Sequence, residues 1–135
     1  MAGYSGTPLV KKLGIKQGMR VLFVNEPSHY MDLLGELPEE IAILDLKAEE
    51  LNFIHFFCED LETLHNLFPI LKEKLTKTGM IWISWIKKAS KNFSWTFTEA
   101  EVRRYGLQIG LVDVKVCAVD EDWSGLKFMY RREDR

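Results

Sequence analysis

The chain has 135 residues, 47% of them hydrophobic and 28% charged, which fits one globular domain and argues against a coiled coil, a disordered chain or two stable domains. Its formal net charge of −2 argues against a dedicated nucleic-acid binder, which needs many cations on one face. The charge is uneven, because residues 1–67 carry 5 basic and 11 acidic side chains and residues 68–135 carry 13 and 9. Either a solvated surface or a docking surface for an anion or acidic partner would explain this asymmetry.

The N-terminal 18 residues contain no apolar core of a secretory signal, and no apolar run is long enough to span a membrane. Cys58 and Cys117 lie inside apolar runs rather than in loops. We therefore expect a cytoplasmic protein with reduced thiols and no membrane association.

The first predicted elements alternate between helix and strand. Thr7-Pro8 favours a short helix over 8–13, closed by Gly14. A strand is predicted at 20–24, a helix from Pro27 or Ser28 to residue 34, and further strands at 41–44 and 53–57. The last of these is apolar on both faces, as expected when helices cover both sides of a sheet.

The centre of the chain predicts a long helix over 61–76, with Asp60 as its cap and Gly79 as its terminator. Pro69 is expected to kink this helix, because proline lacks the N–H group. A buried strand follows at 80–85.

The last third begins with Thr98-Glu99-Ala100-Glu101, a capping box that opens a helix to residue 109. Residues 112–119 alternate between apolar and polar, which places them near a sheet edge, and 120–125 turn the chain into a final strand at 126–130. The order predicts a single α/β domain over 1–135: a three-layer sandwich with a mainly parallel, Rossmann-like sheet of about six strands and a C-terminal antiparallel hairpin.

Three runs resemble class I S-adenosylmethionine (SAM) methyltransferases: 13–22 before and into the first strand, 53–57, and 77–83. The runs 3–9, 112–120 and 123–127 make the whole chain similar to a bacterial family of small proteins of unknown function. The resemblance implies a methyltransferase-like sheet that lacks the third strand of the methyltransferase set.

The turn after the first strand departs from the methyltransferase pattern. It reads Asn25-Glu26-Pro27-Ser28, where the resemblance implies a glycine-rich turn. A Cβ blocks close approach of a cofactor, Pro27 removes a donor, and Glu26 brings a negative charge near the expected cofactor carboxylate. The sequence therefore predicts no ordinary cofactor. Asp45 has the offset of a ribose-binding acid, but a cap of the following turn is the favoured interpretation.

Ligands of open α/β sheets bind outside the carboxyl ends of the strands. This rule selects the candidate ligand-binding residues Asn25, Glu26, Asp45, Trp85, Lys87, Lys88 and Trp123, with Ser28, Cys58, Glu59 and Asp60 beside them. The run 87–91 (KKASK) is either an anion site or a solvated loop. Trp85 and Trp123 either form an aromatic wall beside it or pack in the core, which is commoner for tryptophan.

No catalytic residue and no metal site is predicted. His55 lies mid-strand between apolar residues, so we expect a buried histidine with a local hydrogen bond. Cys58 has no recognisable histidine partner for nucleophilic chemistry, and His29 and His65 are expected on solvent-facing helix surfaces.

Two hypotheses follow. The favoured one is a non-catalytic, methyltransferase-like module that binds a partner or a small anionic ligand. The alternative is a divergent SAM-dependent methyltransferase, in which Asp45 would hold the ribose and Glu59, Asp60 or Trp85 would lie near the transferred methyl group. The partner is unknown from sequence; a homodimer through an exposed hairpin, with Phe128 or Tyr130 facing the second copy, is one option.

Overall fold

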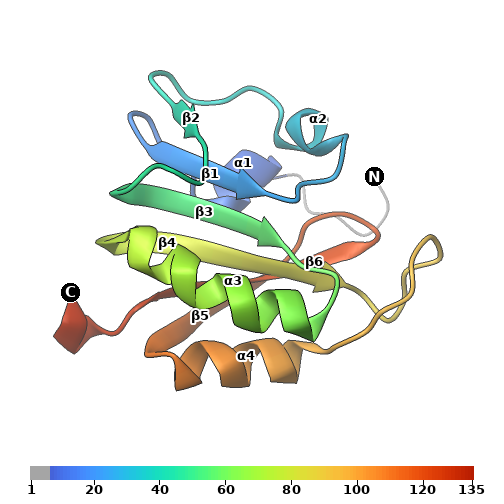
Figure 1. Ribbon diagram of the computed structural model, residues 1–135. Coiled ribbons are helices and arrows are strands. Elements are labelled where there is room, and N and C mark those ends of the chain that lie inside the picture. Colours follow the sequence, from blue (N-terminus) through green and yellow to red (C-terminus); the bar gives the residue numbers. More distant parts are fainter. Residues whose placement is uncertain (1–6) are drawn as a thin grey trace.

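A computed structural model describes residues 7–135 of the chain (Figure 1). One six-stranded sheet, in the order β2-β1-β3-β4-β6-β5, forms its centre. Its strands are β1 (Arg20–Val24), β2 (Ala42–Leu44), β3 (Leu51–Phe57), β4 (Leu75–Ile86), β5 (Leu111–Ala118) and β6 (Trp123–Tyr130). Residues 3–6 of the run that is similar to the bacterial family lie outside the described residues.

Strand direction follows the expected mixed pattern. Strands β2, β1, β3 and β4 pair in parallel, whereas β6 pairs antiparallel with both β4 and β5. Strand β5 therefore runs in the same direction as β4, and the turn between β5 and β6 lies at the edge of the sheet where the parallel strands end. The predicted three-layer α/β fold with a C-terminal antiparallel hairpin is confirmed.

Helices cover both faces of the sheet. The helices α1 (Leu9–Leu13) and α2 (Tyr30–Leu34) pack on one face, and α3 (Leu61–Lys74) and α4 (Glu99–Gln108) lie in front of the other face in Figure 1. A short 3-10 helix, η1 (Arg132–Asp134), follows the last strand. The two core layers are thus separated by the sheet, and alternate residues of each inner strand belong to opposite layers.

Local capping chemistry sets several helix ends as predicted. Gly14 ends α1 in the left-handed conformation, with φ +90°. Asp60 accepts a hydrogen bond from the Thr63 N–H at 2.7 Å and so caps α3, while Thr98 and Glu101 form the capping box of α4.

The boundary between α3 and β4 differs from the prediction. The helix ends at Lys74, and the strand begins at the next residue, so Gly79 is not a helix terminator but lies inside β4. The register between β3 and β4 shifts after Leu51, which makes room for extra residues in β4. A Cβ on Gly79 would come within 2.9 Å of the Leu51 carbonyl oxygen, so this close strand approach requires glycine.

Two other boundaries are shifted. Helix α2 begins at Tyr30, later than predicted, because Ser28 and His29 form a turn. Strand β6 begins at Trp123, earlier than predicted, because the ladder with β4 extends to the pair Ile86 and Trp123. Such boundaries depend on pairing with distant strands, which a local pattern does not contain.

The two edges of the sheet are the three-residue strand β2 and the longer strand β5. The edge position of β5 confirms the prediction from its alternating pattern. Among residues 7–135 no strand lies beyond β2. No helix in this described part has the length and apolar character needed to cross a membrane.

Candidate functional site

The carboxyl ends of β1, β3 and β4 point to the right in Figure 1, towards three connecting segments. These are the turn after β1 (residues 25–29), the loop between β4 and α4 (residues 87–98) and the turn between β5 and β6 (residues 119–122). We call this region the carboxyl edge. Most candidate residues from the sequence lie on these segments or in the strands beside them: Trp85 is near the end of β4, Trp123 begins β6, and Asp45 follows the carboxyl end of β2.

The turn after β1 contains a residue in the left-handed region, where glycine is the commonest residue, but this turn has no glycine. Asn25 has φ +57°, in the left-handed region that asparagine tolerates better than most residues. Asn25 and Glu26 are exposed, and the Pro27 carbonyl accepts the N–H of Tyr30 at 3.0 Å. Helix α2 behind this turn has five residues and no side-chain cap, so it offers little of the N-terminal field that binds anions in longer helices.

A buried polar chain lies beneath that turn. The Tyr30 hydroxyl is 2.6 Å from His55 Nδ1, and His55 Nε2 is 2.7 Å from Ser84 Oγ. All three side chains are buried, and the Tyr30 ring also contacts Phe57, with ring centres 5.1 Å apart. Burial raises the pKa of Tyr30 well above its usual value and lowers the pKa of His55 to about 3. The expectation of a buried, hydrogen-bonded histidine is confirmed. The three side chains are neutral, and their hydrogen bonds link α2, β3 and β4.

Asp45 serves the turn that follows β2. Its Oδ1 accepts the N–H of Lys47 at 2.9 Å, and its carbonyl accepts the N–H of Ala48 at 3.0 Å. The side chain is otherwise exposed. This is the capping role that the sequence favoured over ribose binding.

Asp120 connects all three segments of the carboxyl edge. Its Oδ1 accepts the N–H groups of Asp122 and Trp123, each at 2.8 Å, and its Oδ2 lies 2.9 Å from His29 Nε2. Its carbonyl accepts a 2.6 Å hydrogen bond from Lys87 Nζ. His29 faces solvent as expected, with a half-exposed side chain, but it directly precedes α2 instead of lying on it, and it contacts a carboxylate 91 residues away.

Asp122 holds the loop after β4 in a similar way. Its carboxylate accepts hydrogen bonds from Ser90 Oγ at 2.8 Å and from Asn92 Nδ2 at 3.1 and 3.2 Å. The exposed Lys88 places its ammonium 4.8 Å from the centre of the Trp95 ring. Ser90 is thus engaged with a carboxylate of the same chain, and Lys88 remains at the surface.

The two tryptophans of the candidate set do not form a common wall. Trp85 is buried in the layer beneath α3 and α4, and Trp123 in the layer beneath α1 and α2. The physical reason is the alternation of side chains: Trp123 pairs with Ile86, the neighbour of Trp85, so the two rings lie on opposite faces. Core packing, the commoner role, is confirmed for both.

The residues after β3 show no reactive centre. Burial raises the pKa of the Cys58 thiol to about 11, which disfavours the nucleophilic thiolate. The Cys58 thiol donates to the Asp60 carbonyl at 3.0 Å, and the Glu59 carbonyl accepts the Thr96 hydroxyl. Within residues 7–135, no group of His, Cys, Asp and Glu side chains is arranged to hold a metal ion.

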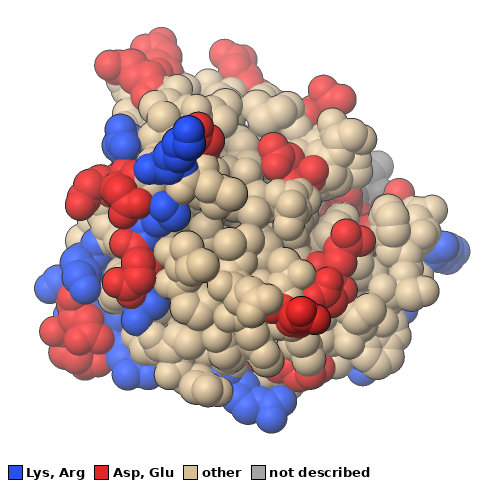
Figure 2. Space-filling view, in the orientation of Figure 1, with Lys and Arg blue, Asp and Glu red and all other residues tan. Residues whose placement is uncertain are grey.

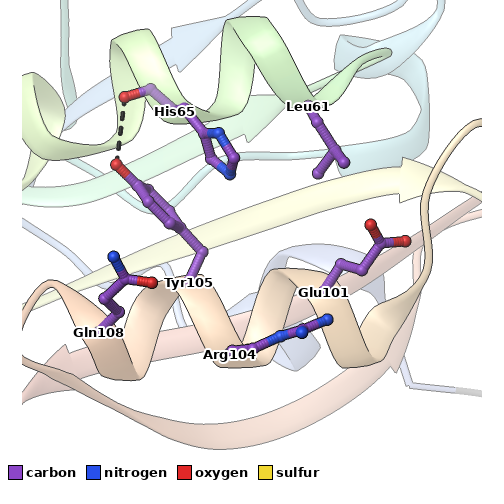
Figure 3. Close-up of a pocket in the computed structure, with 6 residues that line it drawn as sticks. All are labelled: Leu61, His65, Glu101, Arg104, Tyr105 and Gln108. Atoms are coloured by element: carbon purple, nitrogen blue, oxygen red, sulfur yellow. Dashed lines mark hydrogen bonds between the residues drawn. The ribbon is translucent and has the colours of Figure 1, made fainter.

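A separate hollow between α3 and α4 escaped the sequence analysis (Figure 3). It has a volume of about 270 Å³ and is lined by Leu61, His65, Glu101, Arg104, Tyr105 and Gln108. The Tyr105 hydroxyl donates to the His65 carbonyl at 3.2 Å, and the two rings are 4.4 Å apart. His65 is exposed on α3, as expected. Only the packing of the two helices creates the hollow, so no local pattern marks it.

Solved structures with the same fold include several SAM-dependent methyltransferases. One from Aquifex aeolicus has a TM-score of 0.63 and 18% identity, covering 91% of this chain and 88% of that chain. Magnesium protoporphyrin IX methyltransferase from Synechocystis PCC 6803, with bound SAH, has a TM-score of 0.61 and 10% identity, with coverage of 91% and 78%. A possible exported protein from Bordetella parapertussis has a TM-score of 0.65 and 11% identity, with coverage of 90% and 65%.

No protein-family model matches the chain, and no curated protein matches its sequence. The likeness to solved structures therefore rests on shape at low identity, and it confirms the methyltransferase-like, Rossmann-like fold that the resemblance implied. It also shows that a chain of this size can contain most of the fold of a SAM-dependent methyltransferase.

Proposed function

We propose that the protein is a non-catalytic, methyltransferase-like module that binds a partner. The observation that carries the proposal is the internal use of polar groups at the carboxyl edge. Asp120 and Asp122 accept hydrogen bonds from His29, Ser90, Asn92 and the main chain, and Asp45 caps its own turn. A site that must hold a cofactor would present such groups to the ligand instead.

The turn after β1 supports the same conclusion. Its residues Asn25 and Glu26 carry side chains where a cofactor would approach bare backbone, and Pro27 has no N–H to donate. The buried ring of Tyr30 supports this turn from below through its hydrogen bond to His55. Rearranging the turn for a ligand would therefore also disturb a packed and hydrogen-bonded part of the core.

A divergent SAM-dependent methyltransferase is the second candidate. The observation that favours it is the shared fold, including one structure described with bound SAH. In this reading Asp45 would leave its capping contact and hold the ribose. SAM would then supply the methyl group, and the residues after β3 would lie beside it.

Isothermal titration calorimetry with SAM and with SAH separates these functions. We expect no saturable heat with either ligand, and the same result for the Asp45→Ala variant. Saturable binding to the wild type that is lost in Asp45→Ala would overturn the proposal and support the methyltransferase reading. Lys47→Ala, which changes an exposed neighbour on the same turn, is the matched control and should behave as the wild type in either case.

The module could instead bind a small anionic ligand in place of a macromolecular partner. Lys87 and Lys88 would hold it, although Lys87 Nζ already donates to the Asp120 carbonyl. Titration with inorganic phosphate tests this form: a rise in melting temperature that disappears in a Lys87→Ala/Lys88→Ala variant would favour it over a macromolecular partner.

We also propose that the chain belongs to the bacterial family of small proteins that its sequence resembles, and that it works in the cytoplasm. Cys58 and Cys117 are both free and buried, which agrees with a reducing compartment. Reaction of the purified protein with a thiol reagent after unfolding should report two free thiols; a disulfide in protein isolated from its source would contradict this location.

A further inference from the structure

The loop after β4 is a basic surface with exposed aromatic rings. Residues 87–97, which we call the basic loop, contain three lysines and no carboxylate. Phe93 and Trp95 expose 51% and 45% of their surface, which is unusual for such large apolar side chains. In Figure 1 the basic loop extends beyond the carboxyl edge at the far right.

Hydrogen bonds anchor the middle of the basic loop. Asp122 accepts hydrogen bonds from Ser90 and Asn92, and the N–H of Phe93 donates to Ser90 Oγ at 3.1 Å. Lys88 lies over the Trp95 ring. A loop that is anchored in this way before a partner binds loses less conformational freedom on association than an unanchored one.

A surface of opposite charge lies at the other end of the molecule. Residues 32–50, which we call the acidic edge, contain seven carboxylates and one lysine, and they include the edge strand β2. Ile43 and Leu46 expose 51% and 49% of their surface there. Figure 2 shows carboxylates along the top of the molecule, above the position of β2 and the segment that precedes it in Figure 1.

We infer that the basic loop of one copy docks on the acidic edge of a second copy of this chain. The inference rests on the proposed binding function and names its partner. Phe93 and Trp95 would cover Ile43 and Leu46, while the exposed Lys88 and Lys91 face carboxylates of the acidic edge. Apolar burial supplies affinity, and charge complementarity selects the surface and its orientation.

The opposite edge of the sheet fits the basic loop poorly. Strand β5 has a bulge between Asp113 and Lys115, which disrupts regular pairing along that edge. The adjoining hollow has three arginines, Arg131, Arg132 and Arg135, against the two carboxylates of Asp113 and Glu133, so its excess of cations would disfavour the loop lysines. The hairpin homodimer expected from sequence loses its contact residues as well, because Phe128 and Tyr130 are buried.

The inferred contact joins two different surfaces, so it is heterologous. Because the two surfaces lie at different places on the molecule, a pair of associated copies keeps one free surface of each kind. The wild type should therefore form either a closed ring or an open series of copies. A variant that lacks one surface can only cap such a series.

This property gives a decisive test. A loop variant, Phe93→Ser/Trp95→Ser, retains the acidic edge, and an edge variant, Ile43→Lys/Leu46→Lys, retains the basic loop. Sedimentation velocity should show that each variant alone is monomeric, and that their equimolar mixture forms a 1:1 heterodimer of twice the 15.7 kDa chain mass. The control variant Val114→Lys/Val116→Lys changes exposed residues of β5 and should associate as the wild type does.

Several results would overturn the inference. These are a wild type that is monomeric over a wide concentration range, a mixture that gives no heterodimer, or an association abolished only by the β5 variant. Binding of poly(U) or of phosphatidylserine vesicles to the basic loop, without self-association, would also overturn it. Circular dichroism and melting temperature of each variant identify any that fails to fold, in which case Lys88→Glu/Lys91→Glu replaces the loop variant and Glu36→Lys/Glu39→Lys the edge variant. The SAM titrations are independent of these outcomes, so the inference can fail while the proposed function stands.

Discussion

Replacing His55 with glutamine should remove most of the acid sensitivity that this histidine gives to the fold. Buried between Tyr30 and Ser84, His55 has its pKa lowered to about 3 by desolvation, whereas an unfolded histidine titrates at its ordinary 6.5. As pH falls below 6.5, the unfolded state therefore binds a proton that the folded state excludes. The folded state loses stability throughout the interval from pH 6.5 down to pH 3.

The size of the effect follows from the pKa difference. Each pH unit within the interval costs about 1.4 kcal/mol, so lowering the pH from 6.5 to 5 should cost about 2 kcal/mol through His55 alone. Urea unfolding at a series of pH values, followed by circular dichroism, gives the free energy of unfolding for the wild type and for His55→Gln. The variant loses stability at neutral pH from imperfect packing. Between pH 6.5 and 5, however, its free energy of unfolding should fall by about 2 kcal/mol less than that of the wild type.

The control for this prediction is His65→Gln, which removes an exposed histidine on α3. Its acid slope should match that of the wild type. Parallel curves for the wild type and His55→Gln between pH 6.5 and 5 would refute the reasoning, because they would mean that His55 accepts a proton in the folded state as readily as in the unfolded one.

Two further substitutions test contacts in the core, and a third tests how the basic loop is anchored. Gly106→Ala should destabilise the protein by about 1–3 kcal/mol despite a better helix former, because the new Cβ would overlap the buried Phe128 ring; calorimetry showing a higher melting temperature would contradict this. Trp82→Phe removes the 2.8 Å hydrogen bond from the indole N–H to the Leu13 carbonyl and should cost about 1–3 kcal/mol in urea unfolding; an unchanged free energy would show that this bond contributes little. Asp122→Ala should release the basic loop and accelerate tryptic cleavage at its lysines, with little change in melting temperature; unchanged cleavage would show that the loop is held by other contacts.

What could be predicted from the sequence is what depends on near neighbours in the chain. The carboxyl end of α1 and the amino ends of α3 and α4 follow from Gly14, Asp60 and the Thr98–Glu101 pair, which act within three residues of the helix they cap. The inner strands are marked by apolar runs because helices cover both of their faces. The edge strand β5 is marked by alternating apolar and polar residues because it is partly exposed to solvent.

What could not be predicted depends on pairs that are distant in the chain. The position of Gly79 inside β4 follows from its register against β3, and the burial of His55 involves Tyr30, 25 residues away. The contact between His29 and Asp120 spans 91 residues. A search for opposite charges among the segments that meet at the carboxyl edge would have suggested that contact, because the strand order already placed the two turns together.

The contacts of Asp120 and Asp122 bear on both the proposed function and the self-association. These carboxylates bind His29, Ser90 and Asn92, and in doing so they tie the turn after β1 and the basic loop to the β5–β6 turn. The same bonds that occupy the polar groups of the carboxyl edge also anchor Ser90 and Asn92, directly before the exposed Phe93 and Trp95. A cofactor site here would need a mobile loop that closes over a ligand, whereas a docking surface gains from a rigid one. The anchoring of the basic loop by Asp122 is therefore what supports the proposal of a partner over a cofactor.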